Sequence, residues 1–104
     1  MAHILRLVNW DITLPLYYVR GSNGVVGTVK DGEVHAMLFT KRSDASWVSR
    51  NRFDGPAQVA SIKSIDQLEV FTAVGFVYCI VKFNDEDALA MTLEQLRNTL
   101  RAAK

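Results

Sequence analysis

The sequence predicts an α+β domain with a mainly antiparallel sheet of five or six strands packed with three helices. Three observations predict this class. Two strand-like runs, residues 25 to 30 and 33 to 40, flank an Asp31-Gly32 pair that suits a hairpin turn. Residues 76 to 83 are aromatic and β-branched almost throughout, as in a buried strand. Leucines near the C-terminus recur at helical 4-3-4-3 spacing.

The composition bounds the class of protein. A chain of 104 residues, 49% apolar and 22% charged, fits one folded domain, residues 1 to 104, and argues against disordered or fibrous chains. No apolar run approaches the roughly 20 residues that span a bilayer, so we expect a cytoplasmic protein. The net charge of +1 supplies no broad field for nucleic acid. The single Cys79 excludes an intramolecular disulfide and a cysteine-based zinc cluster.

The first half of the chain reads mainly as strands. Residues 3 to 9 fit both a strand and a helical turn, and we favour the strand. Residues 14 to 20 are rich in aromatic and branched side chains, and Pro15 near their start predicts an edge strand. "GSNG" ends it. In the following hairpin, alternate residues are apolar on both faces, so we expect each face to be covered.

The second half alternates between helix and strand. We expect helices over residues 43 to 52 and 64 to 74, a short strand between them, and a central strand over residues 76 to 83. Asn84 is a suitable cap for a last helix over residues 85 to 103, whose acidic start and basic end complement the helix dipole. The predicted apolar core is Leu38, Val48, Val59, Ile62, Leu68, Phe71, Val77, Ile80, Val81, Leu89, Leu93 and Leu96.

A basic segment surrounds the first helix. Its cations are Lys41, Arg42, Arg50 and Arg52. Arg50 and Arg52 project about 160° apart on a helix, so the cations form no continuous stripe. We favour a helix that docks through Ala45, Val48 and Trp47 and keeps its cations solvated. The alternative is a small nucleic-acid or anion-binding site at this segment.

Residues that carry catalytic or metal chemistry are few. His3 and His35 lack metal-ligand partners at suitable spacing, and Cys79 lies in a run that reads as core. We therefore predict no enzyme activity, no metal site and no cofactor. The run "GSNGVVG" lacks the ending of a phosphate loop, so we interpret it as a turn, with Gly27 where a bulge or close strand packing excludes a side chain.

Aromatic and leucine side chains on and near the predicted edge strand indicate a contact surface. This set is Trp10, Leu14, Leu16, Tyr17 and Tyr18. The two tyrosines point to opposite faces, so one can fill the core while the other stays near solvent. The alternative is that both tyrosines pack under helices. An edge strand with no lysine in its middle favours pairing with another chain. We therefore predict a protein-interaction module that forms a homodimer.

The order of elements resembles one family. A Pro-Leu-Tyr-Tyr strand, a hairpin, "LFTKRSDASW", "LEVFTAVGFVYCIVKFN" and a helix beginning "LEQL" are similar to the N-terminal domain of SseB-like proteins. The likeness spans about residues 14 to 96, and Asp85 stands where that family often has proline. The resemblance implies a bacterial cytoplasmic domain without established catalysis, and it transfers no catalytic residues.

Overall fold

The computed structural model describes residues 11–22, 24–53 and 55–103 and has an α+β fold, as predicted. The elements in chain order are β1 (Leu16–Gly21), β2 (Gly24–Val25), β3 (Gly27–Lys30), β4 (Glu33–Phe39), α1 (Arg42–Asn51), β5 (Ala57–Ile62), the 3₁₀ helix η1 (Ile65–Leu68), α2 (Glu69–Ala73), β6 (Tyr78–Lys82), β7 (Ala88–Thr92) and α3 (Leu93–Ala102). The predicted strand at residues 3 to 9 lies outside the described residues.

The strands form one seven-stranded mixed sheet. Its main order is β5-β1-β4-β6-β7, with β2 beside β1 and β3 beside β4. The pairing of β4 with β6 is parallel, and every other pairing among the described strands is antiparallel. The mainly antiparallel sheet is therefore confirmed. It has more strands than the five or six predicted, because the two-residue β2 counts as a separate strand and β7 occupies a segment predicted as helix.

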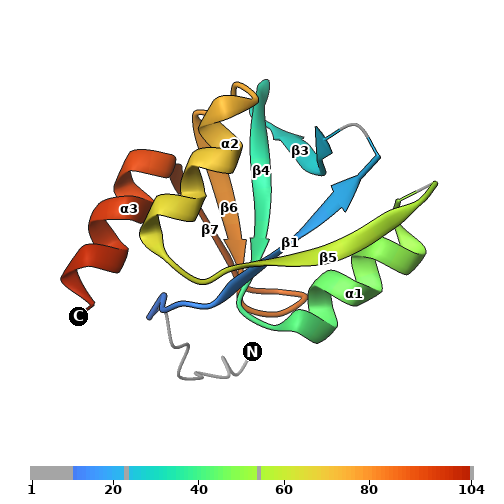
Figure 1. Cartoon of the computed structure of the whole chain (residues 1–104), viewed down its shortest axis with the longest axis horizontal. Coiled ribbons are helices and arrows are strands. Elements are labelled where there is room, and N and C mark those ends of the chain that lie inside the picture. The colour runs from blue at the N-terminus through green and yellow to red at the C-terminus, as the bar shows by residue number, and fades with distance from the viewer. Residues whose placement is uncertain (1–10, 23, 54, 104) are drawn as a thin grey trace, which may run out of the picture.

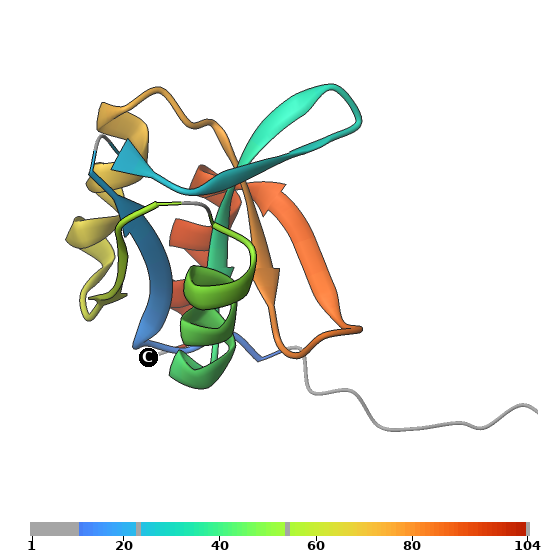
Figure 2. The same ribbon diagram turned by 90° about the vertical axis from the view of Figure 1, so that its right-hand side faces the viewer.

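Helices cover both faces of the sheet, but unequally. The C-terminal helices α2 and α3 pack on one face and α1 packs on the other, against β1, β4 and β5 (Figure 1). The larger buried cluster lies under α2 and α3 and includes Leu38, Phe71 and Leu96, whereas the cluster under α1 is built around Phe39 and Ala45. Figure 2 shows β6 and β7 lying to the side of α1, so α1 does not cover them.

The predicted hairpin is confirmed. Asp31 and Gly32 both have positive φ, 53° and 81°, as the two central residues of a type I′ turn require. The expectation that both faces of the hairpin are covered is correct only for its inner half. At its tip the facing pair Val29 and Val34 is 68% and 54% exposed, because these residues lie beyond the helices.

The last predicted helix is wrong in its first half. Residues 84 to 87 form a turn, in which the side chain of Asn84 accepts hydrogen bonds from the N–H groups of Glu86 and Asp87, each 2.8 Å long. β7 follows, and α3 begins only at Leu93. Thr92 and Gln95 form a reciprocal capping box at that point, which satisfies N–H groups that a helix start leaves unpaired.

Two further expectations are corrected by the pairing and burial. β1 is an interior strand, because β5 pairs with it along one side and β2 and β4 pair with it on the other. Pro15 precedes β1 and so removes no bond from the ladder.

Val77, predicted in the core, is 59% exposed because it precedes β6 at the end of the sheet.

Candidate interaction surface

The predicted interface on β1 does not form a surface. Leu16 and Tyr18 are 0% and 6% exposed and belong to the cluster under α2, where the Tyr18 ring packs edge-on against Phe71 at 5.0 Å. Leu14 and Tyr17 are half-buried, and Trp10 lies outside the described residues. The prediction fails for Leu16 and Tyr18 because an interior strand carries side chains into packed layers on both faces.

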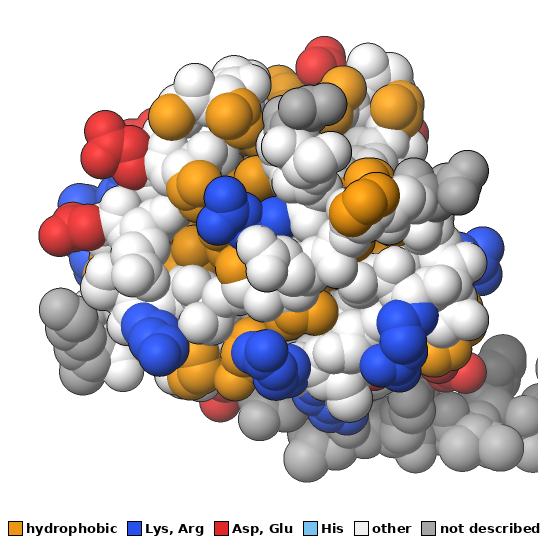
Figure 3. Space-filling view, turned by 45° about the vertical axis from the view of Figure 1, so that its right-hand side comes forward, with side chains coloured by type: hydrophobic (Ala, Val, Ile, Leu, Met, Phe, Trp, Pro, Cys, Tyr) orange, Lys and Arg blue, Asp and Glu red, His pale blue; other side chains and the backbone are white. Residues whose placement is uncertain are grey.

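The basic segment is dispersed along α1. The Arg42 guanidinium lies 5.9 Å from the Tyr17 ring at one end of the helix, and that of Arg52 lies 5.4 Å from the Trp47 ring at the other. Ten residues of helix separate these two arginines by about 15 Å. Lys41 and Arg50 are exposed. In Figure 3 the Lys and Arg side chains on this face are mostly separate spots divided by apolar and uncharged groups.

A groove runs between α1 and the sheet. It has a volume of about 500 Å³ and an apolar floor that includes Met37, Phe39 and Val48. Trp47, which is 47% exposed, stands at the wall with Arg52 beside it. The groove is of the size that small-ligand and peptide side-chain sites have. Its presence leaves apolar surface beside α1 open to solvent.

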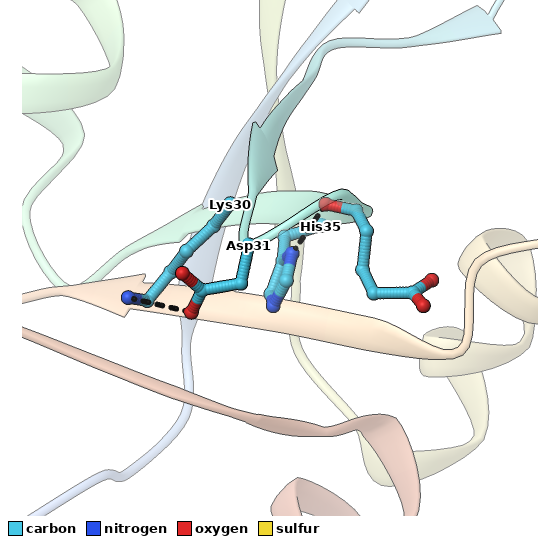
Figure 4. Close-up of polar contacts among 4 residues, drawn as sticks. Lys30, Asp31 and His35 are labelled. Carbon is cyan, nitrogen blue, oxygen red and sulfur yellow. Dashed lines mark hydrogen bonds and ion pairs between the residues drawn. The ribbon is translucent and has the colours of Figure 1, made fainter.

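His35 and Cys79 cannot act together. His35 lies opposite Tyr78 in the parallel register, so the next residue, Cys79, points to the other face of the sheet. His35 Nδ1 donates a hydrogen bond of 2.9 Å to the carbonyl of Glu33, which fixes its ring near the hairpin (Figure 4). Burial raises the pKa of the Cys79 thiol to about 12, so the thiolate is scarce at neutral pH.

Cys79 is expected to resist alkylation while the domain is folded. At pH 8, iodoacetamide should modify native protein far more slowly than protein in denaturant, because the buried thiol is neutral and shielded. Mass spectrometry of quenched samples measures the alkylation rates of native and denatured protein. Equal rates would contradict the buried placement of Cys79.

The raised pKa of Cys79 also makes the stability of the domain depend on pH. The stabilising contribution of the neutral thiol is complete below the unfolded-state pKa of 9.0 and is lost as the pH rises towards 12.

β7 is the open edge of the sheet on the side away from β5. Among the described residues β7 pairs with β6 alone, and its other side faces no strand. Its sequence, Ala88–Thr92, contains neither charge nor proline. Ala88 and Ala90 are exposed, whereas Leu89 and Met91 pack against the cluster under α3. β7 therefore offers unprotected backbone at a ready-made edge.

The sequence did not predict β7 as a strand, because Leu89 fits the helical spacing of the leucines in α3 and so suggests one longer helix. The T-x-x-Q pattern from Thr92 to Gln95 is the signal that could have located the helix start, and hence the strand before it.

Comparisons with known proteins leave the family open. No model of a known protein family matches this chain, and no curated protein matches it in sequence. The resemblance to SseB-like N-terminal domains therefore stays a hypothesis.

Within the described ranges, the structure contains no group of three or more His, Cys, Asp or Glu residues placed to hold a metal ion. The helices of the described part are too short or too polar to cross a bilayer.

Proposed function

We propose that this domain is a non-catalytic protein-interaction module that binds a second copy of itself. The observation that carries the proposal is β7, which among the described residues pairs on one side only and contains neither charge nor proline. Edge strands of this kind pair readily with another chain unless lysine, proline or a covering element prevents it. A cytoplasmic setting belongs to the same proposal and is supported by the single, buried cysteine.

The opposite edge of the sheet supports the choice of β7. β5 is also an outer strand, but Lys63 follows it directly and the exposed, polar Gln58 lies within it. Lysine at or near an edge discourages pairing. β7 has no lysine within it or directly beside it, so it is the less protected of these two strands.

The face next to β7 also favours association. On the side of the sheet that carries α1, Tyr78 and Ile80 of β6 are half-buried, and Ala90, the cross-strand partner of Ile80, is exposed. A second molecule at β7 would cover part of this apolar surface, which contributes to binding in proportion to the area buried. The groove with Trp47 adds apolar surface on the same side of the sheet.

The alternative, a nucleic-acid or anion site at the basic segment, has weaker support. Its cations spread along the whole of α1, and two of them contact aromatic rings. A net charge of +1 adds no attraction at long range. We therefore rank self-association first.

Self-association predicts a concentration-dependent molar mass. Light scattering after size-exclusion chromatography should move from one chain towards two as the loading rises from about 1 to several hundred micromolar, the range in which small edge-to-edge interfaces populate. The control is Gln58→Lys, which changes the other outer strand and should leave the curve unchanged. A single-chain mass across the whole range would refute the proposal.

A further inference from the structure

The hydrogen-bond pattern of β7 shows which of its backbone groups face outward. At one end of the β6–β7 pair the N–H of Phe83 donates to the carbonyl of Asp87, and at the other the N–H of Leu93 donates to the carbonyl of Val77, both at 2.9 Å. In an antiparallel pair, bonded and non-bonded positions alternate. Leu89 and Met91 therefore direct their N–H and C=O groups towards β6, and the groups of Ala88 and Ala90 face outward.

We infer that two copies of this chain join through β7 in an antiparallel pair whose two-fold axis passes at Leu89. This inference rests on the proposed self-association and names its surface and register. With the axis there, Ala88 of each copy lies opposite Ala90 of the partner copy. Each of these two pairs exchanges both of its N–H···O=C bonds, using only groups that β6 does not engage.

Side chains agree with this register. Leu89 meets Leu89 of the partner copy at the axis, on the face where each already packs against its own core cluster. Opposed residues at a non-bonded position approach most closely, so this contact adds apolar burial. On the other face the side chains nearest the axis are the small, exposed Ala88 and Ala90, which leave room for the second copy.

A shift of the axis to Ala90 would be less favourable. Ala88 would then lie opposite Thr92 of the partner copy, but the N–H of Thr92 already donates to Gln95 Oε1 at 2.9 Å. The carbonyl of Thr92 is also at the cap position, where it accepts from the first turn of α3.

Ala90→Pro tests the main-chain bonds at this edge. Proline removes the outward N–H of Ala90 and leaves the bonds to β6, which come from Leu89 and Met91, in place. We expect the dissociation constant of the dimer to rise at least about tenfold, since each copy loses one bond. The matched control is Ala90→Ser, which keeps both the N–H and a small side chain, and which should dimerise like the parent. Circular dichroism melts check that both variants fold.

Cysteine pairing tests the register without depending on the proline variant. Ala88→Cys and Ala90→Cys are made as separate single variants and oxidised alone or as an equal mixture. Bonded antiparallel pairs have Cα atoms about 5.5 Å apart, within the range for a disulfide. We expect a cross-linked dimer on a non-reducing gel from the mixture, and little from either variant alone. Gln58→Cys, on the opposite outer strand, should remain uncross-linked.

The outcomes separate the inference from the proposal on which it rests. Light scattering could show that Ala90→Pro dimerises like the parent, while the mixture of the two cysteine variants gives no cross-link. That result overturns the β7 interface and leaves self-association intact. Cross-linking of Ala90→Cys alone places the axis at Ala90 and overturns the Leu89 register. A single-chain mass at every concentration overturns both. Loss of the dimer in Ala90→Pro together with a cross-link in the mixture alone supports both.

Discussion

Replacing Leu96 by aspartate is expected to unfold the domain. Leu96 is fully buried at the centre of the cluster between α3 and the sheet. Removing such a leucine side chain costs about 2 to 5 kcal/mol from lost packing alone, and an unpaired carboxylate in an apolar core adds several kcal/mol. The sum is comparable to the whole stability of a small domain, about 5 to 15 kcal/mol. Urea titration followed by circular dichroism measures the loss.

The matched control for this variant is Asn98→Asp. Asn98 lies two residues further along α3 and is exposed, so the same new charge should change the free energy of unfolding by no more than about 0.5 kcal/mol. Leu96→Ala should fall between the two. If Leu96→Asp gave a cooperative transition at the urea concentration of the parent, α3 could not be docked as described.

Gly27→Ala is expected to destabilise the domain by overpacking. A Cβ at Gly27 would lie 2.7 Å from the main-chain oxygen of His35 and 2.9 Å from Cε1 of Phe76. The oxygen belongs to β4, and the backbone must shift if it is to move away. Overpacking of this kind costs about 1 to 3 kcal/mol. For a domain of this size each kcal/mol lowers the melting temperature by about 4 to 8 °C, which calorimetry resolves.

Gly21→Ala provides the comparison for Gly27→Ala. A Cβ at Gly21 would also meet an atom too closely, at 2.8 Å, but that atom is the end of the Phe53 ring. A side chain can rotate away where a main-chain oxygen cannot, so we expect a smaller loss at Gly21. Gly27→Ala/Phe76→Leu should recover only part of the stability, because the contact with His35 remains. Full recovery would show that the ring alone limits this site.

The hairpin and α1 could be predicted because local chemistry determines them. Asp31 and Gly32 tolerate positive φ, which fixes the turn and hence the pairing of β3 with β4. Gly27 was expected to exclude a side chain, and the contact with His35 confirms this. α1 follows the spacing of Ala45 and Val48, which pack in one cluster, whereas Trp47, expected to dock with them, is 47% exposed. In each case the deciding residues are close together in sequence.

The region from Asn84 to Leu93 shows where local chemistry is ambiguous. An asparagine followed by acidic residues suits a helix start and a tight turn equally well, because both use the side-chain oxygen to accept backbone N–H bonds. Leu89 fits the helical spacing of the later leucines, yet in a strand it reaches the same cluster. Pairing with β6, a tertiary interaction, decides between the two.

The location of the open edge could not be predicted for a related reason. Whether a strand lies at an edge depends on which strands lie beside it, and the sequence of one strand carries little of that information. Pro15 suggested an edge at β1, but β5 returns from beyond α1 to pair with it over Leu16 to Gly21. The prediction of association through an exposed strand is retained as a proposal, and its residues move from β1 to β7.

The parallel pairing of β4 with β6 also constrains how the chain folds during synthesis. His35 faces Tyr78 and Phe39 faces Lys82, so the two central strands are joined only after some 40 intervening residues have been made. Contacts of such sequence separation close slowly, because loop entropy opposes them. While the chain is still emerging from the ribosome, β4 has one side without its partner strand. The nascent domain therefore passes through a stage at which its own centre is vulnerable to aggregation.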